Sequence, residues 1–162
     1  MFKLESRPIV SRVATTALGM VLLTSATQPV EGSFAVQCTG TARFSDTVTG
    51  ELVTRNYELP RQVYVFDEAT ERVQRAMEPR QEFEDVCPRD GYLARIDFAP
   101  GLIQVRSEGE GVLCDFKVSR VTGEAEFSTR QDLPGGRYNE FQWRMTCSRT
   151  EIPVFDRSRN PF

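Results

Sequence analysis

The stretch FAVQCTGTARF, residues 34–44, decides the fold class. Apolar or small residues occupy every second position and polar residues most of the positions between: Phe34, Val36, Cys38, Gly40, Ala42 and Phe44 against Gln37, Thr39, Thr41 and Arg43. Successive side chains of a strand point to opposite sides, so a period of two is typical of a strand with one buried face. We therefore predict a half-buried β-strand here.

The same alternation recurs through the C-terminal half. Strands are predicted around residues 92–98, 103–105, 112–119, 124–130 and 140–147, with glycine- or proline-containing turns between them. The last of these strands buries Phe141, Trp143, Met145 and Cys147. Because the five strands follow one another directly, we expect an antiparallel meander from Tyr92 onward.

The segment before Tyr92 is less regular. Residues 52–57 and 63–66 are strand-like, and Pro60 between them either ends one strand or bends a single long one. Residues 71–76 are a short polar strand or a helical turn, and Met77 to Asp90 is predicted to be a charged loop. The chain then has eight strands if residues 52–66 form one bent strand, and nine if they form two.

Short antiparallel strands with one apolar face either close into an up-and-down barrel or pack as a β-sandwich. Placing Cys38 opposite Cys147 in an antiparallel pair also places Gly40 opposite Met145, Ala42 opposite Trp143 and Phe44 opposite Phe141. Two of those pairs match a small side chain with a large one, as tight closure requires. We favour the barrel, which in this form presumes an even strand count.

The N-terminus resembles an export signal. Basic residues precede an apolar run from Val13 to Ala26 that is too short to span a bilayer, and Thr24-Ser25-Ala26 offers the small residues that signal peptidase needs. We expect residues 1–26 to be a cleaved signal peptide and residues 27–162 to form a single domain, so that the mature chain has no membrane span.

Four cysteines follow the leader, and an even number in an exported protein predicts disulfides. In the meander, the strands near Tyr92 and Val112 start at the same end of the sheet, so Cys87 can reach Cys114. Cys38 and Cys147 then tie the first strand to the last.

The composition excludes several classes of function. The chain has no histidine, which removes Ser-His-Asp and Cys-His catalysis and histidine-ligated zinc, and the cysteines lack CxxC spacing. A net charge of -3 argues against a nucleic-acid or anionic-membrane surface. We therefore expect no enzymatic activity, no metal and no cofactor.

Two acidic motifs have simpler interpretations than catalysis. A glycosidase would need a carboxylate pair, for which the candidates are Glu82, Glu84 and Asp85 with Asp67 or Asp97. Acids interleaved with arginines are more often a solvated surface. The segment from Glu108 to Gly111 lacks the ligand spacing of a calcium loop and is interpreted as a turn.

Three residues are candidates for ligand binding. Arg120 continues the inward phase of Val118, so its guanidinium could meet an anionic head group inside the barrel. The favoured alternative is that Arg120 ends its strand and reaches solvent at the rim. Trp143 and Tyr92 share the inward phase, although aromatic residues at this spacing are more often core.

Several short motifs together resemble a group of small exported proteobacterial proteins that are themselves uncharacterised. The motifs are Cys38-Thr39-Gly40-Thr41, the run from Val65 to Thr70, the run from Arg120 to Gly123, and the terminal strand ending at Cys147. The resemblance implies a lipocalin-like architecture and a periplasmic or secreted location, and it brings no activity. The first strand lacks the Gly-x-Trp motif that true lipocalins usually carry.

Two hypotheses of function follow. In the first, the protein binds a small apolar or amphipathic ligand in the barrel interior, which requires a cavity. In the second, it is an envelope interaction or inhibitor module acting through the loop Met77 to Asp90 or the tail after Cys147, with a filled core.

Overall fold

The computed structural model describes residues 32–47 and 51–155, and the predicted signal peptide lies outside these residues. Nine strands and one 3-10 turn make up the regular structure of this part. They are β1 Ser33–Asp46, β2 Val53–Asp67, β3 Arg72–Met77, the turn η1 Glu78–Arg80, β4 Glu82–Asp85, β5 Leu93–Phe98, β6 Leu102–Gly109, β7 Val112–Ser119, β8 Glu124–Leu133 and β9 Arg137–Thr150.

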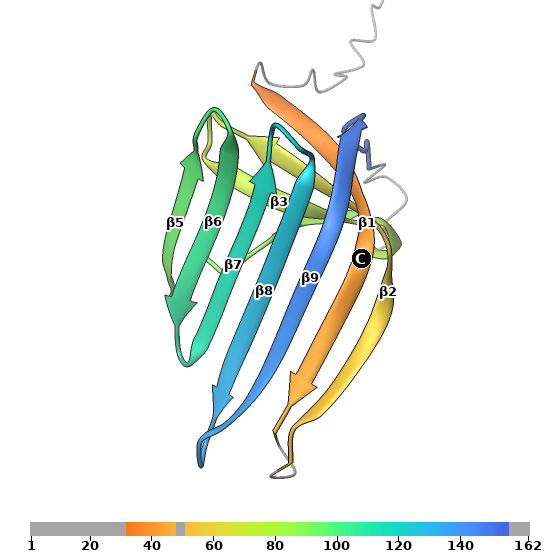
Figure 1. Cartoon of the computed structure of the whole chain (residues 1–162). Coiled ribbons are helices and arrows are strands. Elements are labelled where there is room, and N and C mark those ends of the chain that lie inside the picture. Colours follow the sequence, from red (N-terminus) through yellow and green to blue (C-terminus); the bar gives the residue numbers. More distant parts are fainter. Residues whose placement is uncertain (1–31, 48–50, 156–162) are drawn as a thin grey trace, which may run out of the picture.

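All nine strands belong to one antiparallel sheet in the order β4-β3-β2-β1-β9-β8-β7-β6-β5. The pairing of β1 with β9 joins two meanders, β1 to β4 and β5 to β9, and the sheet curls into a half-barrel (Figure 1). The prediction of an all-β meander with a five-strand C-terminal part is confirmed.

The strand count is nine, one of the two counts that the sequence left open, and the sheet does not close as the even-numbered barrel presumed. Eight antiparallel steps connect β4 to β5 through the sheet, so these two strands run in the same sense. Within the described residues β4 and β5 do not pair with each other. An odd count is therefore compatible with an antiparallel pair between β1 and β9.

The ninth strand is β4, which lies in the segment predicted to be a charged loop. Phe83 pairs with Ala76 of β3, and Glu84 pairs with Arg75. This strand is only four residues long, Glu82 to Asp85, and it has a single apolar residue, Phe83, so no alternation marks it in the sequence.

Pro60 bends one long strand rather than ending it. In the ladder between β1 and β2, Cys38 faces Gln62 and Gly40 faces Leu59, so β2 carries an extra residue at this point. Beyond this irregularity β3 pairs only with the end of β2, from Tyr64 to Asp67. A proline without an N–H is tolerated at such a bulge.

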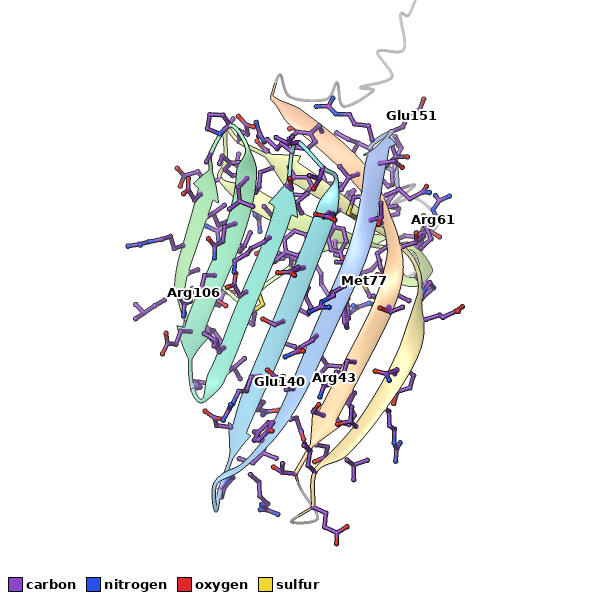
Figure 2. The ribbon with its side chains drawn as sticks, viewed as in Figure 1. Arg43, Arg61, Met77, Arg106, Glu140 and Glu151 are labelled. Atoms are coloured by element: carbon purple, nitrogen blue, oxygen red, sulfur yellow. A yellow bond between two sulfur atoms is a disulfide. The ribbon has the colours of Figure 1, made fainter. Side chains whose placement is uncertain are left out.

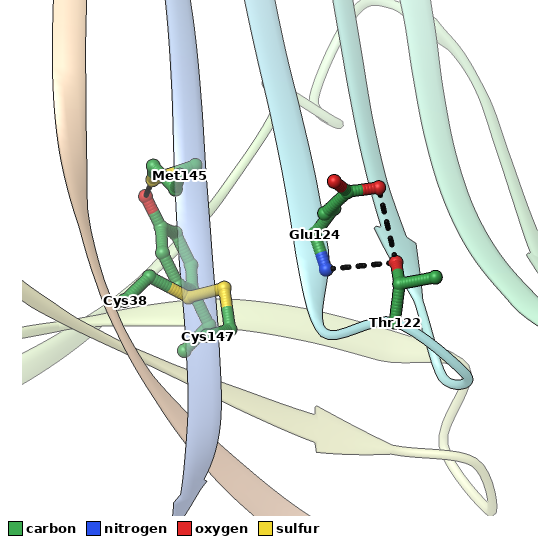
Figure 3. The surroundings of a disulfide bond; sticks show 6 residues. Cys38, Thr122, Glu124, Met145 and Cys147 are labelled. Atoms are coloured by element: carbon green, nitrogen blue, oxygen red, sulfur yellow. Dashed lines mark hydrogen bonds between the residues drawn. A yellow bond between two sulfur atoms is a disulfide. The ribbon is translucent and has the colours of Figure 1, made fainter.

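The predicted register between the first and last strands is confirmed. Cys38 faces Cys147, Gly40 faces Met145, Ala42 faces Trp143 and Phe44 faces Phe141. Both predicted disulfides are present, Cys38–Cys147 and Cys87–Cys114 (the first is shown in Figure 3). The second bridge fastens the connection between β4 and β5 to β7, so it spans the open side of the half-barrel.

The main core fills the concave side of the sheet around fully buried Tyr64, Phe66, Phe116 and Ile103. A smaller cluster lies on the opposite side, where Ile152 and Phe155 of the tail pack against buried Ala35, Val63 and Ala76. In β5, Ile96 and Phe98 contact the main core as expected. Ala94 was expected to face inward with them but is exposed, because it lies beside the open edge of the sheet.

Candidate functional site

A cavity of about 540 Å³ lies where β1 starts and where β7 and β9 end. It is lined by Gly32, Ser33, Phe34, Val36, Glu68, Ile103, Val118, Ser119, Arg120, Gly123, Cys147, Ser148 and Arg149. We call it the rim cavity. Segments far apart in sequence form it because the start of β1 pairs with the end of β9 on one side and with the end of β2 on the other.

Part of the lining of the rim cavity is apolar and already dehydrated. The exposed fractions of Ile103, Val118 and Val36 are only 0%, 4% and 8%. These side chains belong to the main core, which fixes their positions without any ligand. They form the fixed floor of the cavity, and the half-buried ring of Phe34 is the apolar surface in the lining that an entering group can contact.

Two arginines flank one aromatic ring in the same cavity. The guanidinium carbon of Arg149 lies 4.7 Å from the centroid of the Phe34 ring, and that of Arg120 lies 5.5 Å from it. The Phe34 ring also stacks on Phe66, with centroids 4.8 Å apart. The stacked rings hold Phe34 in place, so both cations contact a fixed π surface.

The two cations differ in their partners. Arg120 forms an ion pair with Glu68, and its side chain is 29% exposed. Arg149 forms no ion pair within the part of the chain that the structure describes. The cavity thus carries one carboxylate against two guanidinium groups, which leaves a net positive charge.

Turn geometry places both members of the ion pair. Asp67 Oδ1 accepts the backbone N–H groups of Ala69 and Thr70, and hydrogen bonds, chiefly from the Thr70 side chain, lower the pKa of Asp67. On the opposite wall, the backbone N–H of Arg120 donates to the carbonyl oxygen of Gly101 at 3.0 Å.

The next turn, between β7 and β8, is held by side-chain hydrogen bonds. The Ser119 hydroxyl accepts the N–H groups of Val121 and Thr122. Thr122 in turn accepts the N–H of Glu124 and donates to its carboxylate (Figure 3). This end of the sheet is therefore built from hydrogen-bonded turns.

A second cavity, of about 250 Å³, lies on the concave side of β8 and β9 and is lined by Arg75, Val86, Phe127, Thr129, Phe141 and Trp143. The guanidinium carbon of Arg75 lies 5.8 Å from the Trp143 ring centroid. Arg75 also pairs with Glu84 at 3.2 Å, so its charge is compensated. We call this the tryptophan cavity.

Tyr64 lies opposite Arg75 in the ladder between β2 and β3 and is fully buried. Its hydroxyl donates a weak hydrogen bond to Met145 Sδ at 3.7 Å. Burial raises the pKa of Tyr64 above its ordinary value, and the nearby charge of Arg75 offsets only part of that effect.

The three predicted ligand-binding residues do not come together. Arg120 lines the rim cavity and Trp143 lines the tryptophan cavity. Tyr92 lines neither of them and lies beside Gly109, where β5 and β6 meet. Arg120 follows the last residue of β7 and is partly exposed at the end of the sheet, as the favoured interpretation expected.

Sequence reasoning missed Arg149, Glu68 and Arg75. Arg149 continues the inward phase of Met145 and Cys147, and Arg75 shares the phase of Val73, so alternation alone could have identified both. Glu68 carries no such signal because it lies in a turn.

Three of the acidic residues considered for catalysis, Glu82, Glu84 and Asp85, form ion pairs with arginines instead. Glu84 pairs with Arg75 and with Arg80, and hydrogen bonding, first from Arg80, lowers its pKa. Asp85 pairs with Arg72 at 3.1 Å. Among residues 32–47 and 51–155, no group of three or more potential metal ligands occurs.

The described residues include no helix with the length and apolar character needed to cross a membrane. No protein-family model, curated protein or solved structure matches this chain.

Proposed function

We propose that this protein is an exported, non-enzymatic binding protein that holds a small amphipathic anion in the rim cavity. The observation that carries the proposal is the pair of guanidinium groups, Arg120 and Arg149, above the buried apolar lining of Val36, Ile103 and Val118. Cations beside an apolar surface suit a ligand with a charged head and a short hydrocarbon tail.

The size of the cavity agrees with this ligand class. At about 540 Å³ the rim cavity falls within the range of small-molecule sites, roughly 300 to 1,000 Å³. The tryptophan cavity, at about 250 Å³, falls below it. We therefore place the head group between Arg149 and Arg120 and the tail against the half-buried ring of Phe34.

The cysteines support an oxidising compartment. Both disulfides are formed, and none of the described cysteines is free. Disulfides persist in the periplasm and outside the cell and are rare in the cytosol. Together with the predicted leader, residues 1–26, they lead us to propose a periplasmic or secreted protein that resembles lipocalins in architecture.

Calorimetric titration with a medium-chain carboxylate and with the alcohol of the same chain length tests the proposal. The carboxylate should bind saturably and the alcohol clearly more weakly. Arg149→Gln should weaken carboxylate binding about tenfold or more, because it removes a charge-assisted hydrogen bond. The control is Arg43→Gln, an exposed change on β1 that should leave the affinity unchanged (Figure 2).

Two results would contradict the proposal. Equal binding of the acid and the alcohol would reject the role of the arginines. No saturable binding of carboxylates, alkyl phosphates or alkyl sulfates would reject the ligand class.

The second candidate is an interaction module, and the filled main core favours it. Tyr64, Phe66 and Phe116 leave no exposed surface of their own in the middle of the half-barrel. Of the two segments suggested for it, Met77 to Asp90 contains β4, and the tail packs on the protein itself through Phe155 and Phe83, whose ring centroids are 4.7 Å apart. Native mass spectrometry of protein isolated from its own compartment separates a bound small molecule from a protein partner.

A further inference from the structure

The sheet leaves several stretches of strand with an unpaired side in the described part of the chain, and three of them lie along its free edges. They are the outer sides of β4 and β5, and the part of β2 before Tyr64. Unpaired backbone N–H and C=O groups at an edge can hydrogen-bond to another strand. Which strand can pair with a given edge depends on whether its side chains are compatible with those of the edge strand that they would lie opposite.

A second copy of the same strand is the simplest occupant, and symmetry restricts its register. Two copies that extend one sheet across a two-fold axis pair antiparallel, and directly opposed residues share a face. Each residue therefore faces a residue an even number of positions away, or its own copy. Opposite charges two positions apart along one edge strand are then self-complementary.

The edges of β4 and β2 do not have opposite charges two positions apart. Symmetric pairing of β4 about Phe83 would bring Glu82 opposite Glu84 of the second copy, so like charges would meet. In β2, Arg55 and Glu58 are three positions apart and lie on opposite faces, so they cannot pair. The bulge at Pro60 also ends the regular part of that edge.

The edge of β5 does have opposite charges two positions apart. Its sequence LARIDF has Arg95 and Asp97 two positions apart on the convex face. Symmetric pairing about Ile96 would bring Arg95 opposite Asp97 of the second copy, and the reverse, so two ion pairs would form. On the concave face Ala94 would lie opposite Phe98, and Ile96 opposite its own copy.

In the described part of the chain, neither charged residue of β5 has an ion-pair partner, whereas Arg106 of β6 has Asp115 of β7 opposite it on its other side. Arg95 lies directly opposite Arg106 of β6, which is labelled in Figure 2, so two like charges face each other across the ladder. Within residues 32–47 and 51–155, Arg95, Asp97 and Arg106 form no ion pair. An acidic side chain next to Arg95 would offset that repulsion.

Apolar exposure points to the same edge. Leu93, the first residue of β5, is 85% exposed, and in the symmetric register it would lie opposite Ala99. Proline enters this register only beyond Ala99, at Pro100, so every strand residue from Leu93 to Phe98 retains its backbone N–H.

We propose that β5 is a self-association edge through which two copies of this chain form a symmetric antiparallel dimer, centred on Ile96 and held in register by two Arg95–Asp97 ion pairs. The dimer joins two half-barrels into one continuous sheet. It is independent of the rim cavity, whose lining includes no residue of β5.

Reversal of charge tests the register directly. Sedimentation velocity over a concentration series should find a reversible dimer of the mature chain. Asp97→Arg and Arg95→Asp should each weaken it at least about tenfold, because the two-fold axis doubles each like-charge contact. The double variant R95D/D97R should restore the dimer, and mixing the two single variants should give a heterodimer.

The matched control is Glu58→Arg, which makes the same charge reversal at the free edge of β2 and should leave the dimer intact. Near-ultraviolet circular dichroism of each variant reports whether it is folded. A monomeric wild-type protein over the whole series would overturn the proposal. So would a dimer that survives Asp97→Arg, a folded double variant that stays monomeric, or a dimer lost in folded Glu58→Arg, which would move the interface to β2.

Discussion

Cys38 and Cys147 lie directly opposite each other in the ladder between β1 and β9, with their Cα atoms 4.1 Å apart and their sulfurs bonded. The two residues are 109 positions apart in sequence. This bridge therefore closes nearly the whole domain at the one strand pair that joins its two meanders. Both the stability of the fold and the position of the rim cavity depend on that pair.

Removing this bridge should destabilise the protein more than removing the other. In the loop-entropy model a disulfide stabilises by restricting the unfolded chain, and the effect grows with the separation of its cysteines. With separations of 109 and 27, the variant C38S/C147S should lose about 1 kcal/mol more than C87S/C114S. Urea denaturation of both variants measures the difference; an equal or reversed order would contradict the argument.

Gly40 should not tolerate a side chain. A Cβ atom there would overlap the carbonyl oxygen of Arg144 and lie 2.7 Å from the Cα of Met145, both of which belong to the backbone of β9. Gly40→Ala should therefore force the two strands apart and cost roughly 1 to 3 kcal/mol. Gly101→Ala is the control, because no atom lies within 4 Å of its Cβ position. Equal denaturation midpoints for the two variants would show that β9 adjusts freely.

Tyr64 should contribute to alkaline unfolding. Burial raises its pKa in the folded protein, whereas in the unfolded chain the phenol titrates near 10.0. Above that pH the unfolded chain binds fewer protons than the folded one, so the free energy of unfolding falls by about 1.4 kcal/mol per pH unit on account of Tyr64. Below that pH this contribution is fully present and constant.

Tyr64→Phe should therefore flatten the alkaline limb of stability against pH. Urea unfolding at a series of pH values above and below 10 measures the slope. Tyr57→Phe, made at a side chain that is 47% exposed, is the matched control for the loss of a phenol. A Tyr64→Phe variant whose slope equals that of the wild type would refute the assignment.

The tail after β9 should behave as part of the fold. Phe155 packs against Phe83 of β4 and, with Ile152, covers Ala35 and Val63 on the convex side of the sheet. Phe155→Ala should cost about 1 to 3 kcal/mol, somewhat less than truncating a fully buried Phe. Val154→Ala, at an exposed neighbour, should be nearly neutral. If both changes were neutral, the tail would be free to engage a partner.

The sequence by itself determined the strands of the C-terminal meander, the register of the first strand against the last, and both disulfides. These features are predicted from the alternation of apolar and polar residues and from turn residues, which are local patterns that can be recognised in the sequence alone. The small residues Gly40 and Ala42 lie opposite the large residues Met145 and Trp143, and this match of side-chain sizes can be read from the sequence once the two cysteines are aligned. Even so, β4 escaped detection because a four-residue strand shows too few alternations.

Only the tertiary structure decided how the sheet ends and which residues meet at its rim. Whether the end strands β4 and β5 pair depends on the curvature of the whole nine-strand sheet and on the relative direction of its two ends. No local sequence pattern specifies either property. The same holds for the rim cavity, since Phe34, Arg120 and Arg149 come from three strand ends that alternation alone cannot align. Arg120 and Trp143 share a face, yet the filled core between the two ends of the half-barrel separates them into different cavities.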